Sequence, residues 1–275
     1  MKMPVLYVVA TPIGNMGDIT PRAVEILRDS GLIIAEDTRT AGLLLERFNI
    51  PQKKAVSFFE GNEIKKLGYI AREIETAGKA ALITEAGTPC ISDPGYRLVS
   101  MLRKKGVDVI PVPGPCAAIT ALSASGIPSD RFAFEGYLPK NDKKLREFLS
   151  ALKWERRTLV FYESPRRIRR SLEVMSGIFG GREACLFREM TKVYEESIFA
   201  PLSGILEKLQ PEPRGEITLV VSGCVETQKT DYDFEKIVSL IREEAGISAS
   251  KAAKIAAKIT GLKKRDIYRV TAEKG

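Results

Sequence analysis

This chain of 275 residues contains no histidine. The absence excludes Ser-His-Asp and Cys-His catalytic triads, imidazole as a general base, and every metal site built on histidine. The few cysteines form no Cys-x-x-Cys pair, which disfavours a zinc ribbon or a thioredoxin-like redox pair. We expect them to be reduced, mostly buried thiols of a cytosolic protein: Cys90, Cys116, Cys185 and Cys224.

Nucleotide-binding fingerprints are also missing. Neither Gly-x-Gly-x-x-Gly nor Gly-x-x-x-x-Gly-Lys-[Ser/Thr] occurs, so a nicotinamide enzyme and a P-loop NTPase are disfavoured. Residues 1–10 are more typical of a first strand than of a signal peptide. The uncharged window 109–129 is long enough to span a bilayer. Its prolines and glycines predict strand, turn, helix and turn instead, so we expect no membrane association.

The composition that is present suits a folded α/β protein. Hydrophobic residues make up 44% of the chain, and its length corresponds to about two domains with room for a small third. The formal net charge is +8, which makes a polyanionic partner plausible.

Short apolar runs alternate with helical patterns in the first half. Thr20 and Pro21 form a typical helix start, with a hydroxyl cap followed by proline at the first helical position. The alternation predicts a mostly parallel sheet covered by helices. Its expected strands are 5–10, 32–35, 80–84 and 107–112, and its helical patterns end near Gly31, Gly78 and Gly106.

The rest of the chain divides into two blocks. The first predicts a mixed sheet, because two strand candidates flank 190–194 with no room for a helix between them. Its strand candidates are 132–137, 158–162, 184–187, 195–199 and 216–221. The tail predicts short helices over 234–244, 248–259 and 263–270, with Lys251, Lys254 and Lys258 on one face. We therefore expect an N-terminal α/β domain (1–126), a second α/β domain (127–224) and a small basic helical domain (225–275).

Ligands of open α/β sheets bind beyond the carboxyl ends of the strands, so the loops that follow the strands are the candidate sites. Five such loops carry polar or glycine-rich sequences: 11–18, 36–39, 58–63, 85–95 and 113–118. Structural roles compete for their polar residues, because Asp37 or Thr38, Asn62 and Asp93 each stand where they can cap a helix. Small residues after Pro113 open a helix whose free N–H groups suit a polar ligand.

These loops carry a resemblance to a known family. Leu6–Asn15, Glu36-Asp37-Thr38-Arg39, Ala86–Gly95, Pro113-Gly114-Pro115 and Phe161–Pro165 occur in the order found in it. The chain closely resembles the bacterial 16S ribosomal RNA (cytidine-2′-O)-methyltransferases of the tetrapyrrole methylase superfamily. The resemblance covers about residues 5–223 and is weaker in the tail.

The resemblance implies a two-domain, homodimeric, cytoplasmic methylase that uses S-adenosylmethionine and no metal. It also implies that the substrate is 16S rRNA, either as naked RNA or in the assembled 30S subunit. The donor-binding residues it implies are Pro12, Gly14, Asp93, Tyr96, Gly114, Cys116, Ala117 and Tyr162. The chain departs from the family where relatives usually carry histidine, at Thr40, Phe59, Gly61 and Arg166. Since the acids and Asn62 remain, we interpret imidazole as dispensable.

A ribose hydroxyl needs a proton acceptor, and the candidates are Glu60, which we prefer, Asp37 and Glu36. Arg39 can hold a phosphate through its planar fork, and Asn62 can orient the substrate. Basic clusters suit RNA phosphates. The further RNA contacts that we expect are Arg166, Arg167, Lys251, Lys254 and Lys258.

Two alternative functions stay open: a methylase acting on a corrinoid or porphyrin precursor, and a non-catalytic RNA-binding assembly factor.

Overall fold

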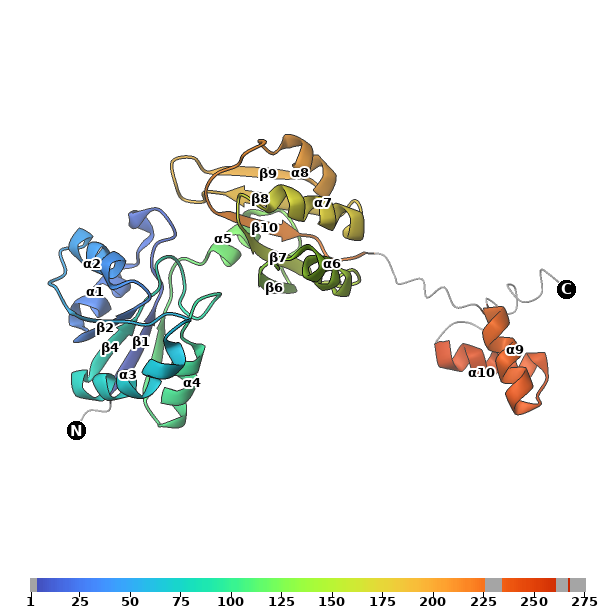
Figure 1. Ribbon diagram of the computed structural model, residues 1–275, viewed down its shortest axis with the longest axis horizontal. Helices are drawn as coiled ribbons and strands as arrows, with labels where there is room; N and C mark the ends of the chain where they lie inside the picture. Colours follow the sequence, from blue (N-terminus) through green and yellow to red (C-terminus); the bar gives the residue numbers. More distant parts are fainter. Residues whose placement is uncertain (1–3, 226–233, 261–266, 268–275) are drawn as a thin grey trace. The chain divides into compact units, whose positions relative to one another are not determined.

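The structure is a computed structural model that describes residues 4–225, 234–260 and 267. The chain forms two compact units, 1–225 and 226–275, which are described separately. The first unit contains two five-stranded sheets, in the orders β3-β2-β4-β1-β5 and β6-β7-β10-β8-β9 (Figure 1).

The first sheet is parallel throughout. Its interior strand β2 is buried along its whole length, as expected for a strand covered on both faces. The predicted parallel sheet and its four expected strands are confirmed, with boundaries shifted by at most two residues, and a fifth strand, β3, precedes the loop 58–63. The strands are β1 (Val5–Val9), β2 (Leu32–Ala35), β3 (Lys54–Ser57), β4 (Lys79–Leu82) and β5 (Asp108–Val112).

Helices cover both faces of this sheet. Alternate residues of β2 enter different cores: Leu32 and Ile34 pack with α3 and α4, whereas Ile33 packs with α1 and α2. Thr20 caps α1 as predicted, since its side chain accepts a hydrogen bond from the Ala23 amide. The helices are η1 (Met16–Asp18), α1 (Pro21–Asp29), α2 (Thr38–Arg47), α3 (Glu63–Ala77) and α4 (Tyr96–Lys104).

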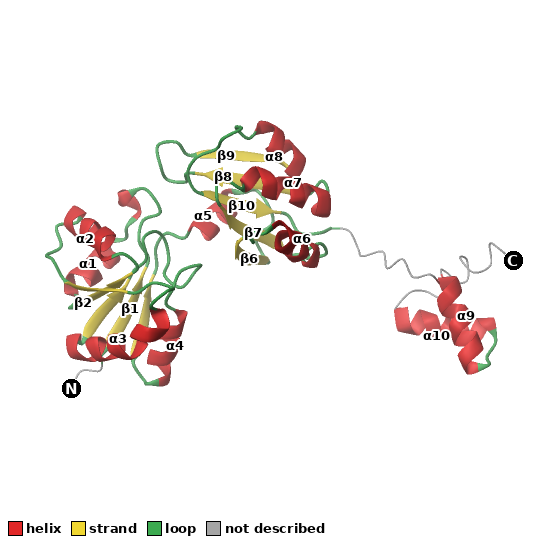
Figure 2. Ribbon diagram, in the orientation of Figure 1, coloured by secondary structure: helices red, strands yellow, loops and turns green. Residues whose placement is uncertain are grey.

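The second sheet is mixed, as predicted. β6 pairs with β7 in parallel, and the remaining pairs are antiparallel. Figure 2 shows helices packed against this sheet. Its elements are β6 (Phe132–Tyr137), α6 (Asp142–Ala151), β7 (Thr158–Glu163), α7 (Ile168–Phe179), β8 (Glu183–Arg188), β9 (Glu196–Pro201), α8 (Leu202–Lys208) and β10 (Ile217–Val221).

Helix α5 (Ala117–Ala124) connects the two sheets. It follows the last strand of the first sheet, yet its buried residues Ala118, Ala121 and Leu122 pack with Val160 and Val220 of the second. The loop after β5 is therefore anchored at both ends. This placement holds the strand ends of the first sheet beside β7 and β10.

The tail forms a separate small unit. Helices α9 (Phe234–Ala245) and α10 (Ala249–Thr260) pack through Val238, Ala252, Ala253, Ala256 and Ile267. The helix expected over 263–270 lies outside the described residues except for Ile267. Within the described part of the chain, no helix is long and apolar enough to cross a membrane.

The cysteine prediction is correct only in part. All four cysteines are among the described residues, and none forms a disulfide. Cys185 alone is buried, and the other three are half-buried. The expectation of mostly buried thiols is wrong because Cys90 and Cys116 stand in loops at the strand ends, and Cys116 lines a cavity there.

Candidate active site

Parallel pairing places the loops that follow β1, β2, β4 and β5 at one edge of the first sheet. The first and fourth loops are joined by a backbone pair: the Thr11 amide donates to Gly87 O at 2.8 Å, and the Gly87 amide donates to Thr11 O at 3.1 Å. The fourth and fifth loops are joined by the Thr88 hydroxyl, which donates to Pro115 O at 2.9 Å. These bonds make the strand ends one rigid rim.

The loop 85–95 between β4 and α4 has an unusual backbone. Gly87, Cys90, Ser92 and Gly95 have φ of 90°, 70°, 63° and 135°. A Cβ on Gly95 would lie 2.7 Å from the Cys90 sulfur, so glycine is required there on both grounds. The prediction that Asp93 caps the following helix is wrong. Helix α4 starts after the turn, with Gly95 at the N-cap position, and the Asp93 side chain faces a cavity instead.

Glu63, the first residue of α3, stabilises this turn. Its carboxylate is buried, accepts a hydrogen bond from the Gly95 amide at 3.2 Å and pairs with Arg97 at 3.5 Å. Asn62 stands at the N-cap of α3, as the alternative structural interpretation expects. Its side chain does not cap the helix; it accepts a hydrogen bond from the Phe59 amide at 2.9 Å. The 59–63 segment is thereby tied to the loop that carries Asp93.

A cavity of about 410 Å³ opens at the rim between the two sheets of the first unit. We call it the donor cavity, after the methyl donor that the family resemblance leads us to expect there. Residues of the first, second, fourth and fifth loops form one side, and the ends of β6, β7 and β10 form the other. The side chains that matter below are Glu36, Glu85, Asp93, Cys116, Tyr137 and Tyr162.

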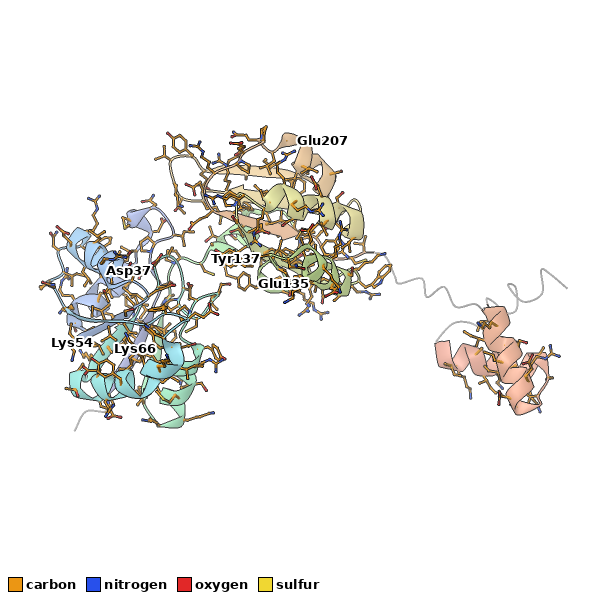
Figure 3. All side chains as sticks on the ribbon, viewed as in Figure 1. Asp37, Lys54, Lys66, Glu135, Tyr137 and Glu207 are labelled. Atoms are coloured by element: carbon orange, nitrogen blue, oxygen red, sulfur yellow. The ribbon has the colours of Figure 1, made fainter. Side chains whose placement is uncertain are left out.

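Tyr162 at the end of β7 is held in place from two directions. Its hydroxyl accepts a hydrogen bond from the Ala118 amide at 3.1 Å, and its ring packs edge-on against Phe134 and Tyr137. Burial raises its pKa. One of the helix N–H groups that we expected to face a ligand is thus already used by the protein itself. In Figure 3, Tyr137 on the second sheet and Asp37 at the rim of the first are labelled.

Carboxylates dominate the electrostatics of this region. Burial raises the pKa of Glu36, and the negative charges of Glu85, Asp93 and Glu60 raise it further. Burial also raises the pKa of Asp93, with Glu85 adding to the effect. Among the described residues, no three acids or cysteines are placed to share a metal ion. Because its charged groups are mainly carboxylates, the cavity has a negative potential that favours a cationic ligand.

The residues expected to bind the donor fall into two sets. Asp93, Cys116, Ala117 and Tyr162 line the donor cavity. The other four do not: Pro12 lines a neighbouring cavity, Gly14 packs against Lys192, Gly114 packs against Ala10, and Tyr96 is exposed beside Arg97. A Cβ on Gly114 would lie 2.9 Å from the Ala10 Cβ, so this glycine serves the close approach of two strand ends.

The three candidate proton acceptors differ in their position relative to the donor cavity. Glu36 lines the donor cavity, whereas Glu60 is exposed and does not line it. Asp37 caps α2, as one structural interpretation expects, by accepting from the Arg39 amide at 2.7 Å. The Arg39 guanidinium, 2.6 Å away, and this hydrogen bonding lower the pKa of Asp37 to about 2.

The residues expected to contact RNA differ in their exposure and in whether they already have a partner within the protein. Arg39 and Arg166 are exposed, and so are Lys251, Lys254 and Lys258 on α10. Arg167 instead pairs with the fully buried Glu163 at 2.5 Å and donates to Leu138 O at 3.2 Å. Arg166 and Arg167 belong to a basic stretch, residues 153–170. Other arginines of this stretch also have partners inside the unit: Arg157 with Glu155, Arg169 with Leu209 O, and Arg170 with Asp142.

Glu85 is a site residue that the sequence interpretation did not select. It directly follows the buried residue Thr84 at the end of the β4 segment, and it is exposed within the rim. No described residue donates a hydrogen bond to its carboxylate or forms an ion pair with it. Its position as the first charged residue after a buried strand was the available signal.

A methylase fold and an acidic cavity at its strand ends agree with the similarities of the chain. The model of the tetrapyrrole (corrin/porphyrin) methylases matches residues 5–206, and that of an RsmI C-terminal HTH domain matches 233–273. The chain therefore belongs to the tetrapyrrole methylase family and is a methyltransferase.

Curated relatives match over almost the whole chain. A protein of Escherichia coli O157:H7 named ribosomal RNA small subunit methyltransferase I is 43% identical, covering 98% of this chain and 94% of its own length. The Haemophilus influenzae protein of the same name is 44% identical, covering 96% and 95%.

Solved structures share the fold at low identity. A uroporphyrin-III-C-methyltransferase of Thermus thermophilus has a TM-score of 0.55 and 20% identity, covering 80% of this chain and 94% of its own. A diphthine synthase has a TM-score of 0.57 and 14% identity, covering 79% and 90%. These likenesses confirm the predicted fold class.

Proposed function

We propose that this protein transfers a methyl group from S-adenosylmethionine to the 2′-hydroxyl of a cytidine in the 16S rRNA of the small ribosomal subunit. The observation that supports it best is the acidic donor cavity, built from the loops that carry the family resemblance. The name shared by relatives over nearly the whole chain supports the choice of RNA.

The residues of the donor cavity fit S-adenosylmethionine. Its sulfonium and ammonium groups are cations, and the carboxylates of Glu36, Glu85 and Asp93 lie around the cavity. When bound, this donor supplies an electrophilic methyl group. Tyr162, fixed by the Ala118 amide, and the rim formed by loops 85–95 and 113–117 would hold the donor.

Glu36 is the proton acceptor in this proposal. It combines a place in the cavity with a raised pKa, so its carboxylate is a stronger base than an ordinary glutamate. Glu60 contributes through its charge, which raises the pKa of Glu36. The exposed Arg39, beside Glu36 and Glu85 at the rim, is placed to contact a backbone phosphate.

The same carboxylates disfavour a tetrapyrrole precursor as the substrate. A porphyrin or corrinoid precursor carries many carboxylates, and these would be repelled by Glu36, Glu85 and Asp93. A ribose is neutral, and its phosphates can remain outside the cavity. The electrostatics therefore favour the ribose.

The direct test uses radiolabelled S-adenosylmethionine, unmethylated 30S subunits and nuclease mapping of the label. We expect label on the ribose 2′-oxygen of a single cytidine. If the protein binds the donor and labels no RNA, the proposed substrate is wrong and tetrapyrroles become the next trial. If it does not bind the donor, the assembly-factor alternative is favoured.

Removing the buried Glu63 carboxylate is expected to weaken donor binding. In Glu63→Ala the Gly95 amide loses its acceptor, so the turn that presents Asp93 is no longer held. A hydrogen bond to a charged group contributes about 1.5–3 kcal/mol, which corresponds to a loss of donor affinity of about tenfold or more. Calorimetric titration measures it. Glu75→Ala, at an exposed acid of the same helix, is the control and should bind normally.

Replacing the three α10 lysines is expected to reduce the salt dependence of RNA binding. Lys251, Lys254 and Lys258 are all exposed. For a single strand, each phosphate contact contributes about 0.7 to the slope of log binding constant against log salt concentration. The triple alanine variant should therefore lower the slope by roughly 2. Replacement of the exposed pair Lys104 and Lys105 is the control. An unchanged slope with a changed oligomeric state would assign these lysines to contacts between copies.

We also propose a cytoplasmic homodimer of chains, each organised as 1–126, 127–224 and 225–275. The family resemblance supports this proposal. Sedimentation equilibrium of the purified protein tests the oligomeric state.

A further inference from the structure

A second cavity of about 420 Å³ lies beside the donor cavity, and neither the donor nor the proton acceptor uses it. We call it the α2 cavity. Its walls are mainly apolar and come from the first loop, η1 and α2, including Met16, Leu43 and Leu44. Met16 is 41% exposed and Leu43 is 67% exposed, as expected of residues at an open mouth. The polar residues of the lining are two carboxylates, Asp37 and Glu85, together with Arg47, Thr40 and Thr84.

Glu85 connects this cavity to the reaction site. It lines the donor cavity, the α2 cavity and the shallow pocket that contains Glu36, Arg39 and Phe59. The two carboxylates of the α2 cavity differ in availability. Asp37 is held by Arg39, whereas no described residue bonds to the Glu85 carboxylate. Glu85 is therefore the hydrogen-bond acceptor available at the junction of the three spaces.

We infer that the α2 cavity holds the cytosine base of the nucleotide being methylated, and that Glu85 reads its exocyclic amine. The inference rests on the proposed function. When the 2′-oxygen of a ribose lies against Glu36 and the donor, the base lies close by, because the glycosidic bond joins it to the adjacent ring carbon. The α2 cavity shares Thr84 and Glu85 with the donor cavity and so lies next to that position.

The chemistry of the walls suits a pyrimidine that is unstacked from the RNA. Apolar side chains such as Met16, Leu43 and Pro12 can pack against the faces of a base. A carboxylate accepts a hydrogen bond from the cytosine N4 amine. Uracil carries a carbonyl oxygen at that position, which the Glu85 carboxylate would repel. A purely apolar partner would leave the Glu85 carboxylate without a hydrogen-bond donor in this cavity.

The first test compares 30S subunits that carry cytidine or uridine at the mapped position. We expect the wild-type protein to prefer cytidine in kcat/KM by at least about tenfold, the value of one good base contact. In Glu85→Gln the side-chain amide can donate to O4 or accept from N4, so the preference should fall to within about threefold. Equal loss on both substrates would overturn the inference, because a purely catalytic or structural role of Glu85 predicts that result.

The second test blocks the mouth of the cavity. Leu43→Glu should raise KM for 30S subunits about tenfold and leave donor affinity unchanged. Ile64→Glu on α3 is the matched control, because the two aliphatic side chains are 67% and 69% exposed and Ile64 lies in neither cavity. A dimer lost in Leu43→Glu with cytidine preference intact would assign the cavity to a contact between copies and overturn the inference. Wild-type protein that labels neither substrate would instead contradict the proposed function.

Discussion

Glu36→Gln is expected to lower the turnover number for RNA methylation by about 10²–10⁴-fold, while donor binding persists. Glu36 is the candidate acceptor that lines the donor cavity and has a raised pKa. The amide keeps the shape of the side chain but cannot take a proton. Single-turnover methylation of 30S subunits measures the chemical step, and calorimetry measures donor binding.

Glu60→Gln is the matched comparison for this prediction. Glu60 is exposed and outside the donor cavity, so its loss should cost less than about threefold in turnover. A larger loss in Glu60→Gln than in Glu36→Gln would return the proton-acceptor role to Glu60, the residue that the sequence pattern favoured.

The pH profile provides a second measure of the same role. A carboxylate base works only when ionised, so kcat/KM should fall as the pH drops through the raised pKa of Glu36. The negative charge of Glu85 contributes to that raised pKa. In Glu85→Gln the pKa of Glu36 should fall, and the acid limb should move to lower pH. A limb that stays in place would contradict the assignment.

Arg167→Met is expected to destabilise the first unit by about 3–5 kcal/mol, because it leaves a buried carboxylate without its counter-charge. The Glu163 side chain is fully buried and 2.5 Å from the Arg167 guanidinium. It also accepts hydrogen bonds from the Ser164 amide and the Ser171 hydroxyl, each at 2.6 Å. Urea denaturation followed by the fluorescence of Trp154, the single tryptophan, measures the loss.

Two variants separate the buried pair from general effects of charge. Arg166→Met, at the exposed neighbouring arginine, should change the stability by less than about 0.5 kcal/mol. Adding Glu163→Gln to Arg167→Met should recover part of the loss, because no buried charge then remains. Equal destabilisation by Arg166→Met and Arg167→Met would contradict this account.

The sequence predicted the parallel sheet well because its signals are local. Strand residues such as Leu32–Ala35 are continuously apolar, Thr20 and Pro21 mark a helix start, and Gly78 and Gly106 follow helix ends. Loop order then predicted which segments meet at one edge of the sheet. The mixed second sheet followed from the short connection between two of its strands.

Local signals failed where a side chain has two possible partners. Asp93 precedes a proline as a cap would, but the turn supported by Glu63 delays the helix and leaves Asp93 in the cavity. Arg167 belongs to a basic run, but the fold supplies it with a buried carboxylate. The first choice depends on Glu63, which is distant in the chain, and the second on the burial of Glu163, four residues before Arg167. Periodicity encodes neither the distant contact nor the burial.

By itself, the sequence determined the alternation of strands and helices, the exclusion of imidazole chemistry, and the loops that form the site. The tertiary structure alone decided that Glu36 lines the donor cavity while Glu60 remains exposed, and that Glu85 connects three cavities. The physical reason is that burial and charge–charge proximity determine the chemistry of a carboxylate, and both arise only when separate loops meet in space.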